Sequence, residues 1–194
     1  MYRQWKKLGA AVALAIGLGA PSAHAATEDL SIDNSTPFHP QFVSSFSPEG
    51  IINVFGLRGE VYGGLILDDS NPDFYAFIAD ANRVITITVA SSNGPNFGDD
   101  PKVGLFDGIG GPLLASDNDS GPGFDALLSY KTWHLGIYLV AVTGSSDLNF
   151  NLGGGSTNFP YLLTIKSAAV PVPGAAVLLG SGLLGLAGVK RRRS

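Results

Sequence analysis

The chain has 194 residues, no cysteine and a formal net charge of −4 at pH 7. The absence of cysteine excludes disulfide bonds, thiolate metal sites and cysteine nucleophiles. All sixteen acidic residues lie between Glu28 and Asp147, whereas positions 26–169 hold only five basic residues, Arg58, Arg83, Lys102, Lys131 and Lys166. This acidic balance argues against binding to nucleic acid, which requires cationic side chains to neutralise phosphates. It is compatible with solubility or with divalent cations.

Residues 1–25 have the pattern of a secretory signal peptide, with a basic start and an apolar run at 8–20. Ala23 and Ala25 flank His24 in a small-x-small cleavage motif, so we expect the mature chain to begin at Ala26. The alternative, an uncleaved N-terminal anchor, is disfavoured because the apolar run is short and ends in proline.

Residues 26–50 are predicted to be an irregular lead-in, because prolines interrupt them and serine and asparagine are common. From residue 51 onward, short apolar runs alternate with turn-forming residues. The predicted strands are 51–57, 60–67, 73–79, 83–90, 102–106, 112–116, 124–130, 135–142 and 161–166. Strand 83–90 alternates most clearly, with Ile85, Ile87 and Val89 facing inward, and strand 161–166 alternates with Tyr161, Leu163 and Ile165 inward. Strand 135–142 is apolar on both faces, which is typical of a central strand of a sandwich. We expect an all-β domain over residues 51–168, an antiparallel β-sandwich or jelly roll of eight or nine strands.

The order of these strands resembles the bacterial pre-peptidase C-terminal type of domain. The matching segments, in chain order, are DFYAF at 73–77, ITITV at 85–89, VGLFD at 103–107, LLASDND at 113–119 and GIYLVAV at 136–142. The resemblance covers roughly residues 59–166. It implies a non-catalytic, often secreted β-sandwich, of a type in which some members bind calcium.

An acidic turn follows residue 116 and is the best candidate for a metal site. Calcium takes six to eight oxygen ligands, and alternating carboxylates in a loop can supply several of them. The candidate ligands are Asp107, Asp117, Asp119 and Asp125. An EF-hand is excluded, because Pro122 and Leu128 occupy positions where that loop requires Gly and Glu. The alternative is an ordinary solvated turn, and apart from calcium we expect no cofactor.

No catalytic constellation is visible in the sequence. The chain lacks a G-x-S-x-G elbow, and the histidines that remain after signal cleavage, His39 and His134, lie far apart. We therefore expect a protein that is not an enzyme, with a secreted hydrolase as a remaining alternative. Exposed Tyr130, Trp133 and Tyr138 would form a platform for stacking on sugar rings; the alternative is that they pack in the domain.

Residues 169–194 form a distinct tail. Val170, Pro171, Val172 and Pro173 precede an uncharged apolar run at 174–189, and Lys190, Arg191, Arg192 and Arg193 follow it. A helix over 174–189 would be roughly 24 Å long, short of the ~30 Å hydrocarbon core, so it is a marginal transmembrane helix. The terminal basic residues favour a cytoplasmic end, which places the rest of the chain outside the inner membrane.

The order of proline signal, apolar helix and arginine cluster resembles the PEP-CTERM sorting tail of Gram-negative bacteria. Such tails are recognised and cleaved near the signal by an exosortase, a membrane protease. Val172 stands where the family usually has glutamate, which bears on which exosortase would accept the tail. The resemblance implies an inner-membrane intermediate followed by display at the cell surface or release. The role it implies is structural or adhesive, within an exopolysaccharide matrix or biofilm, with polysaccharide as a partner. The alternatives are a plain tail anchor and a calcium- or carbohydrate-binding module.

Overall fold

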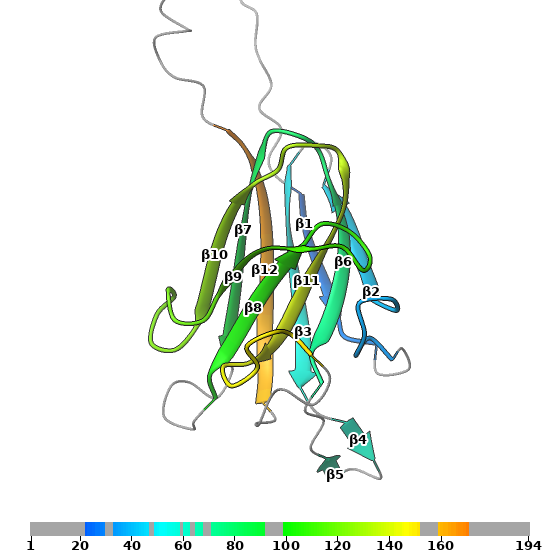
Figure 1. The fold of residues 1–194 in the computed structure, drawn as a ribbon, viewed down its shortest axis with the longest axis vertical. Helices are drawn as coiled ribbons and strands as arrows, with labels where there is room; N and C mark the ends of the chain where they lie inside the picture. Colours follow the sequence, from blue (N-terminus) through cyan, green and yellow to red (C-terminus); the bar gives the residue numbers. More distant parts are fainter. Residues whose placement is uncertain are drawn as a thin grey trace, which may run out of the picture.

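The structure, a computed structural model, describes residues 22–29, 33–46, 49–58, 60–62, 65–67, 71–91, 99–151 and 159–170. These residues form an all-β fold and contain no helix (Figure 1). The predicted signal helix within residues 1–21 and the predicted transmembrane helix at 174–189 lie outside the described residues. Within the described residues, no helix is long and apolar enough to cross a membrane.

Ten of the strands form two five-stranded sheets. Sheet 1 has the order β1 (Ser22–Thr27), β3 (Gly50–Arg58), β12 (Phe159–Ala169), β7 (Arg83–Ser91), β10 (Ala126–Lys131). Sheet 2 has the order β2 (Gln41–Phe46), β6 (Asp73–Ala79), β11 (Gly136–Gly144), β8 (Pro101–Phe106), β9 (Leu113–Asp117). A separate hairpin consists of β4 (Glu60–Tyr62) and β5 (Leu65–Leu67).

Both sheets are mixed, which differs from the predicted antiparallel sandwich. The edge strand β1 pairs in parallel with β3, and the edge strand β2 pairs in parallel with β6. All other pairings are antiparallel. β2 comes from the segment at 26–50, which the sequence predicts to be irregular, whereas β1 overlaps the end of the predicted signal peptide and the first two residues of that segment. An edge strand gains much of its stability from backbone pairing with one neighbour. Such a segment can therefore form a strand without a sustained alternation of apolar residues.

The core lies between the two sheets. Side chains that point inward from both are fully buried, and they include Ile52, Val54, Ile85, Ile87, Val89, Leu163 and Ile165 of sheet 1 and Tyr75, Phe77, Val103, Leu105, Tyr138 and Val140 of sheet 2. The inward positions predicted for strands 83–90 and 161–166 are confirmed, since β-branched residues at alternate positions give a strand one continuous apolar face. The predicted strand 60–67 is instead divided into β4 and β5.

A second apolar cluster covers the outer face of sheet 2. Phe74, Ala76, Leu139 and Ala141 of β6 and β11 are buried there beneath Phe150. The Phe150 ring packs edge-on against Phe106 at a centroid distance of 5.6 Å. These residues explain why β11 is apolar on both faces, as the sequence predicts, and why β6 is apolar on both faces as well.

Candidate functional site

The described chain begins and ends at one end of the sandwich. Ser22 of β1 is the register partner of Gly50 in β3, and Gly50 is also the partner of Ser167 in β12. Ala169, the last residue of β12, is paired with Arg83, the first of β7. Figure 1 shows β12 ending at the top of the view. We call this the terminal end, and both predicted export segments join the sandwich there.

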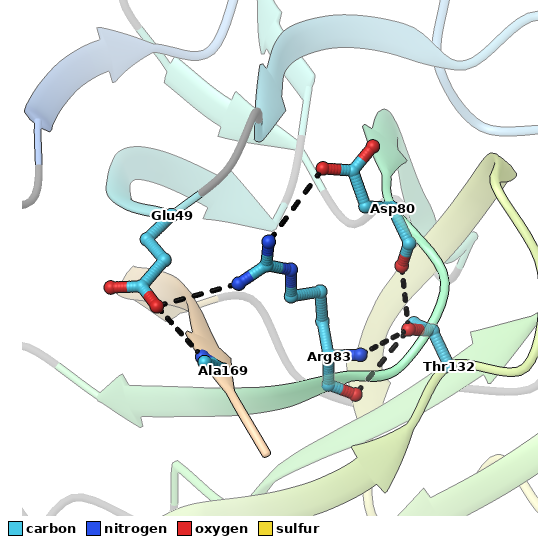
Figure 2. A network of polar contacts seen from close by, with 5 residues as sticks. All are labelled: Glu49, Asp80, Arg83, Thr132 and Ala169. Atoms are coloured by element: carbon cyan, nitrogen blue, oxygen red, sulfur yellow. Dashed lines mark hydrogen bonds and ion pairs between the residues drawn. The ribbon is translucent and has the colours of Figure 1, made fainter. Parts of the chain in front are cut away.

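Glu49 joins three strands of sheet 1 at the terminal end (Figure 2). It directly precedes β3, and its Oε1 accepts a hydrogen bond from the backbone N–H of Ala169 at 3.0 Å. The same oxygen lies 3.4 Å from Nη1 of Arg83, whose Nη2 is 4.0 Å from Oδ2 of Asp80. The Glu49 carboxylate therefore holds Ala169, the last residue of β12, which directly precedes the predicted sorting signal at 170–173.

Thr132 holds the neighbouring turn, after β10, to the start of β7. Its buried hydroxyl accepts a hydrogen bond from Arg83 N–H at 2.9 Å and donates to the carbonyl oxygen of Asp80 at 2.7 Å. Its backbone adds two more bonds, because Asn82 N–H donates to Thr132 O and Thr132 N–H donates to Arg83 O, both at 2.9 Å. The turns at 80–83 and 132–135 are thus fixed to each other.

Replacing Glu49 with alanine should loosen the end of β12. Glu49→Ala removes both the acceptor for Ala169 and the partially exposed ion pair, so we expect a loss of up to about 1 kcal/mol of unfolding free energy. Amide hydrogen exchange should show the Ala169 N–H exchanging faster. Glu49→Gln is the matched control, because its carbonyl oxygen still accepts from Ala169. If both variants exchange at the wild-type rate, Glu49 does not hold β12.

Most of the predicted sorting residues lie outside the described residues, whereas the predicted cleavage residues lie on β1. Val170 is the last described residue, while Pro171, Val172, Pro173, Lys190, Arg191, Arg192 and Arg193 lie outside the described residues. Ala23, Ala25 and Ala26 lie on β1, opposite Ile51, Asn53 and Val54 of β3. Cleavage before Ala26 would thus remove the first four residues of an edge strand. The remaining end stays bound, since Glu28 N–H donates to Phe55 O at 2.8 Å and Glu28 Oε2 accepts from Leu57 N–H at 2.7 Å.

The three aromatic residues predicted as a sugar platform do not share one surface. Tyr138 is 1% exposed, and its ring is stacked between Phe77 and His134. Burial raises the pKa of Tyr138, and its hydroxyl donates to the carbonyl oxygen of His134 at 2.9 Å. Trp133 is 67% exposed in the turn at 132–135, where Lys131 Nζ lies 4.6 Å from its ring centroid. The packing alternative is correct for Tyr138, because alternation along β11 directs that residue into the core.

The four predicted calcium ligands are not brought to one centre. Asp107 lies in the turn after β8, where its Oδ1 is 3.0 Å from Nε2 of His134. Asp117 lies at the far end of β9, where its carboxylate accepts hydrogen bonds from Ser120 and from Leu127 N–H. Burial opposes ionisation there, but these hydrogen bonds outweigh it and lower the pKa of Asp117. Within the described residues, no group of three or more carboxylate or histidine side chains is placed to hold a metal ion.

The other two predicted calcium ligands, Asp125 and Asp119, also accept hydrogen bonds from protein groups. Asp125 Oδ1 accepts from Ser91 N–H at 3.2 Å, which joins the turn before β10 to the end of β7. Asp119 Oδ2 accepts from the side-chain amide of Asn118 at 2.8 Å. The alternating acidic pattern therefore supplies the hydrogen bonds of a turn in this structure, and calcium binding stays a prediction.

A buried polar cluster lies at the opposite end of the sandwich, and the sequence did not reveal it. Tyr161 donates to Oδ2 of Asp73 at 2.8 Å, and its hydroxyl oxygen is 2.6 Å from that of Tyr75. Burial, and next the negative charge of Asp73, raise the pKa values of Tyr75 and Tyr161 well above 10.0. Arg58 is fully buried nearby, with its guanidinium 5.8 Å from the Phe159 ring centroid. The hydrogen bonds among these buried side chains stabilise the fold.

Comparison with known proteins gives similarity to solved structures. No family model and no curated protein sequence matches the chain. The pre-peptidase C-terminal domain of a collagenase from Bacillus anthracis is similar, with 15% identity and a TM-score of 0.40 over 66% of this chain and 95% of that one. PliG, a periplasmic inhibitor of g-type lysozyme from Aeromonas hydrophila, is similar with 9% identity and a TM-score of 0.39 over 77% of this chain and 100% of that one.

Proposed function

We propose that this protein is an exported, non-catalytic component of a cell-surface or extracellular polysaccharide matrix. In this proposal the tail at 169–194 holds the chain in the inner membrane until an exosortase-type protease cleaves it near Pro171 and Pro173. The observation that supports it best is the position of the tail. Sheet 1 is complete at Ala169, and the first proline of the signal is two residues further on.

This position separates processing from folding. Cleavage between residues 170 and 174 would remove no strand residue, because β12 ends at Ala169. The hydrogen bond from Ala169 to Glu49 would remain after cleavage, so the sandwich would leave the membrane fully paired along β12. The signal also stays within reach of the folded domain, because the four residues 170–173 span at most about 14 Å when fully extended. A protease that acts there has to work beside the terminal end.

The described side chains favour a binding or structural role over catalysis. The carboxylates described above accept hydrogen bonds within turns, pair with a histidine, or accept a hydrogen bond in a buried cluster. Both ring nitrogens of His134 lie within hydrogen-bond distance of oxygen acceptors, Asp107 Oδ1 and Leu135 O. A serine nucleophile needs one of these nitrogens as its base, so His134 is poorly arranged for a triad.

Processing in the native host tests the proposal. We expect the intact mass of the surface or medium species to correspond to a chain that begins near Ala26 and ends between residues 170 and 173. Pro173→Ala, or deletion of residues 191–193, should leave the sandwich folded and cause unprocessed chain to accumulate in the membrane fraction. Pro122→Ala, in an exposed turn of the sandwich, is the matched control and should be processed normally. A wild-type species that keeps Arg193 in the inner membrane would show a plain anchor instead.

A further inference from the structure

Two large apolar side chains project from the terminal end. Trp133 is 67% exposed and Leu135 is 66% exposed, and both lie in the turn between β10 and β11. Covering these two side chains with a second apolar surface would be favourable, because it would remove apolar area from water. The question is therefore what meets the turn at 132–135.

Hydrogen bonds hold the turn on both sides of Trp133, so the exposure of the Trp133 side chain is part of the folded structure. Thr132 is buried and bonded to Asp80 and Arg83, as described above. On the other side of Trp133, His134 is fixed through its carbonyl oxygen to Tyr138 and through its ring to Asp107. Trp133 thus stands between two anchored residues and is presented outward.

The turn lies close to the point where the tail leaves the sandwich. β12, β7 and β10 are consecutive in sheet 1, and Arg83 of β7 is both the register partner of Ala169 and the hydrogen-bond partner of Thr132. Two strand spacings put Thr132 about 10 Å from Ala169. The apolar run begins at Gly174, and five extended residues reach at most about 18 Å. Insertion of 174–189 would therefore hold the turn beside the bilayer surface.

The charge distribution favours the same orientation. Near the terminal end, Arg83, Lys131 and Lys166 offset the carboxylates of Glu49, Asp80 and Asp107. At the opposite end, the carboxylates are more numerous than the cations Arg58 and Lys102; they include Asp73, Asp99, Asp117, Asp119, Asp125 and Asp147. The terminal end therefore carries less net negative charge than the opposite end, and an anionic membrane repels it less. Tryptophan flanked by a lysine is also the residue pair that membrane interfaces accommodate, with the ring at headgroup level and the ammonium in water.

We propose that Trp133 and Leu135 contact the lipid headgroup region while the tail is in the membrane, so that the sandwich lies against the bilayer by its terminal end. This inference rests on the proposed insertion of the tail. Contact at the turn fixes the orientation of the sandwich and holds the signal at 170–173 at the membrane surface. After cleavage the same turn becomes free, and the released protein gains an exposed aromatic side chain.

Tryptophan fluorescence tests the contact, because the chain has two tryptophans, Trp5 and Trp133. In full-length Trp5→Phe protein, Trp133 is the single reporter. The protein is reconstituted into vesicles of phosphatidylethanolamine and phosphatidylglycerol, with and without brominated lipid. We expect emission shifted to shorter wavelength, quenching by brominated lipid and protection from acrylamide, relative to the same protein lacking residues 174–189.

A reporter at the opposite end is the matched control. Phe124 is 51% exposed in the turn before β10, so Phe124→Trp in a Trp5→Phe, Trp133→Phe background moves the reporter away from the terminal end. It should co-float with the vesicles, yet show no quenching by brominated lipid. Equal quenching of both reporters would overturn the proposed orientation.

The other outcomes separate this inference from the proposed function. If the protein co-floats with vesicles but Trp133 stays accessible to acrylamide and unquenched by brominated lipid, the tail inserts and the contact is refuted. If the protein does not co-float, both tail insertion and the contact are refuted. If purified exopolysaccharide of the host shifts the emission and brominated lipid does not, the turn is a sugar contact and the membrane inference is wrong.

Discussion

Gly56→Ala should destabilise the protein by about 2–5 kcal/mol, because the added methyl group would displace a buried ring and break its hydrogen bond. Gly56 of β3 is paired with Tyr161 of β12, and the ring of Tyr161 lies across the glycine. A Cβ at Gly56 would be 2.6 Å from Cε2 of Tyr161 and would also overlap its Cζ and hydroxyl oxygen. The ring would have to move away and lose its hydrogen bond to Asp73.

Urea unfolding monitored by circular dichroism measures this loss. Phe55→Ala, at the neighbouring and 58% exposed position, is the control and should change the unfolding free energy by less than about 1 kcal/mol. In the double variant Gly56→Ala, Tyr161→Leu, the obstructing ring is absent, so the two losses should be less than additive. Strict additivity would mean that the ring does not cause the strain.

Alkaline pH should unfold the protein steeply because Tyr75 and Tyr161 are buried. Burial, and next the charge of Asp73, hold their pKa values well above 10.0, the ordinary value that both regain on unfolding. Their stabilising contribution is therefore fully present below pH 10. Above pH 10 the unfolded chain loses protons that the folded chain keeps, so the unfolding free energy falls as pH rises. Two groups give a slope of about 2.7 kcal/mol per pH unit, which persists until the folded tyrosines ionise.

Urea titrations between about pH 9 and pH 12, with tyrosinate absorbance as a second probe, measure this slope. Tyr75→Phe leaves one buried tyrosine, so the slope should fall to about half while the stability at neutral pH also decreases. The part of the tyrosinate absorbance that comes from Tyr75 and Tyr161 should rise in step with unfolding. Ionisation of all tyrosines while the protein remains folded would contradict the prediction.

The polar contacts at the two ends of the sandwich differ in their surroundings and in what they hold together. Asp73, Tyr75 and Tyr161 join sheet 2 to sheet 1 by hydrogen bonds inside the core, where an unsatisfied polar group is costly. Glu49 and Arg83 hold strand ends through a partly exposed ion pair, where solvent weakens the contact, and the buried hydroxyl of Thr132 joins the neighbouring turns. The first set stabilises the fold, and the second fixes where the tail departs.

Most strands were predictable from the sequence, because alternation of apolar residues is a local property. β6 was predicted with its observed bounds, and β7 and β12 with their inward faces correct. The serine-containing edge strands β1 and β2 give no such signal. They form because distant backbones, of β3 and β6, offer unpaired hydrogen-bonding groups. A sequence pattern read over ten residues does not contain that information.

The sequence by itself determined the all-β class, the acidic balance of the domain, and the two terminal segments from which we argue export. Only the tertiary structure decided which side chains meet. Asp107, ten residues before Asp117, pairs with His134 instead of joining the acidic turn. Tyr161, 88 residues from Asp73, is within hydrogen-bond distance of it. The order of strands also brings Ala169 beside Arg83 and Thr132, and so sets Trp133 next to the tail. Strand periodicity follows from neighbouring residues, whereas proximity across a sandwich follows from topology.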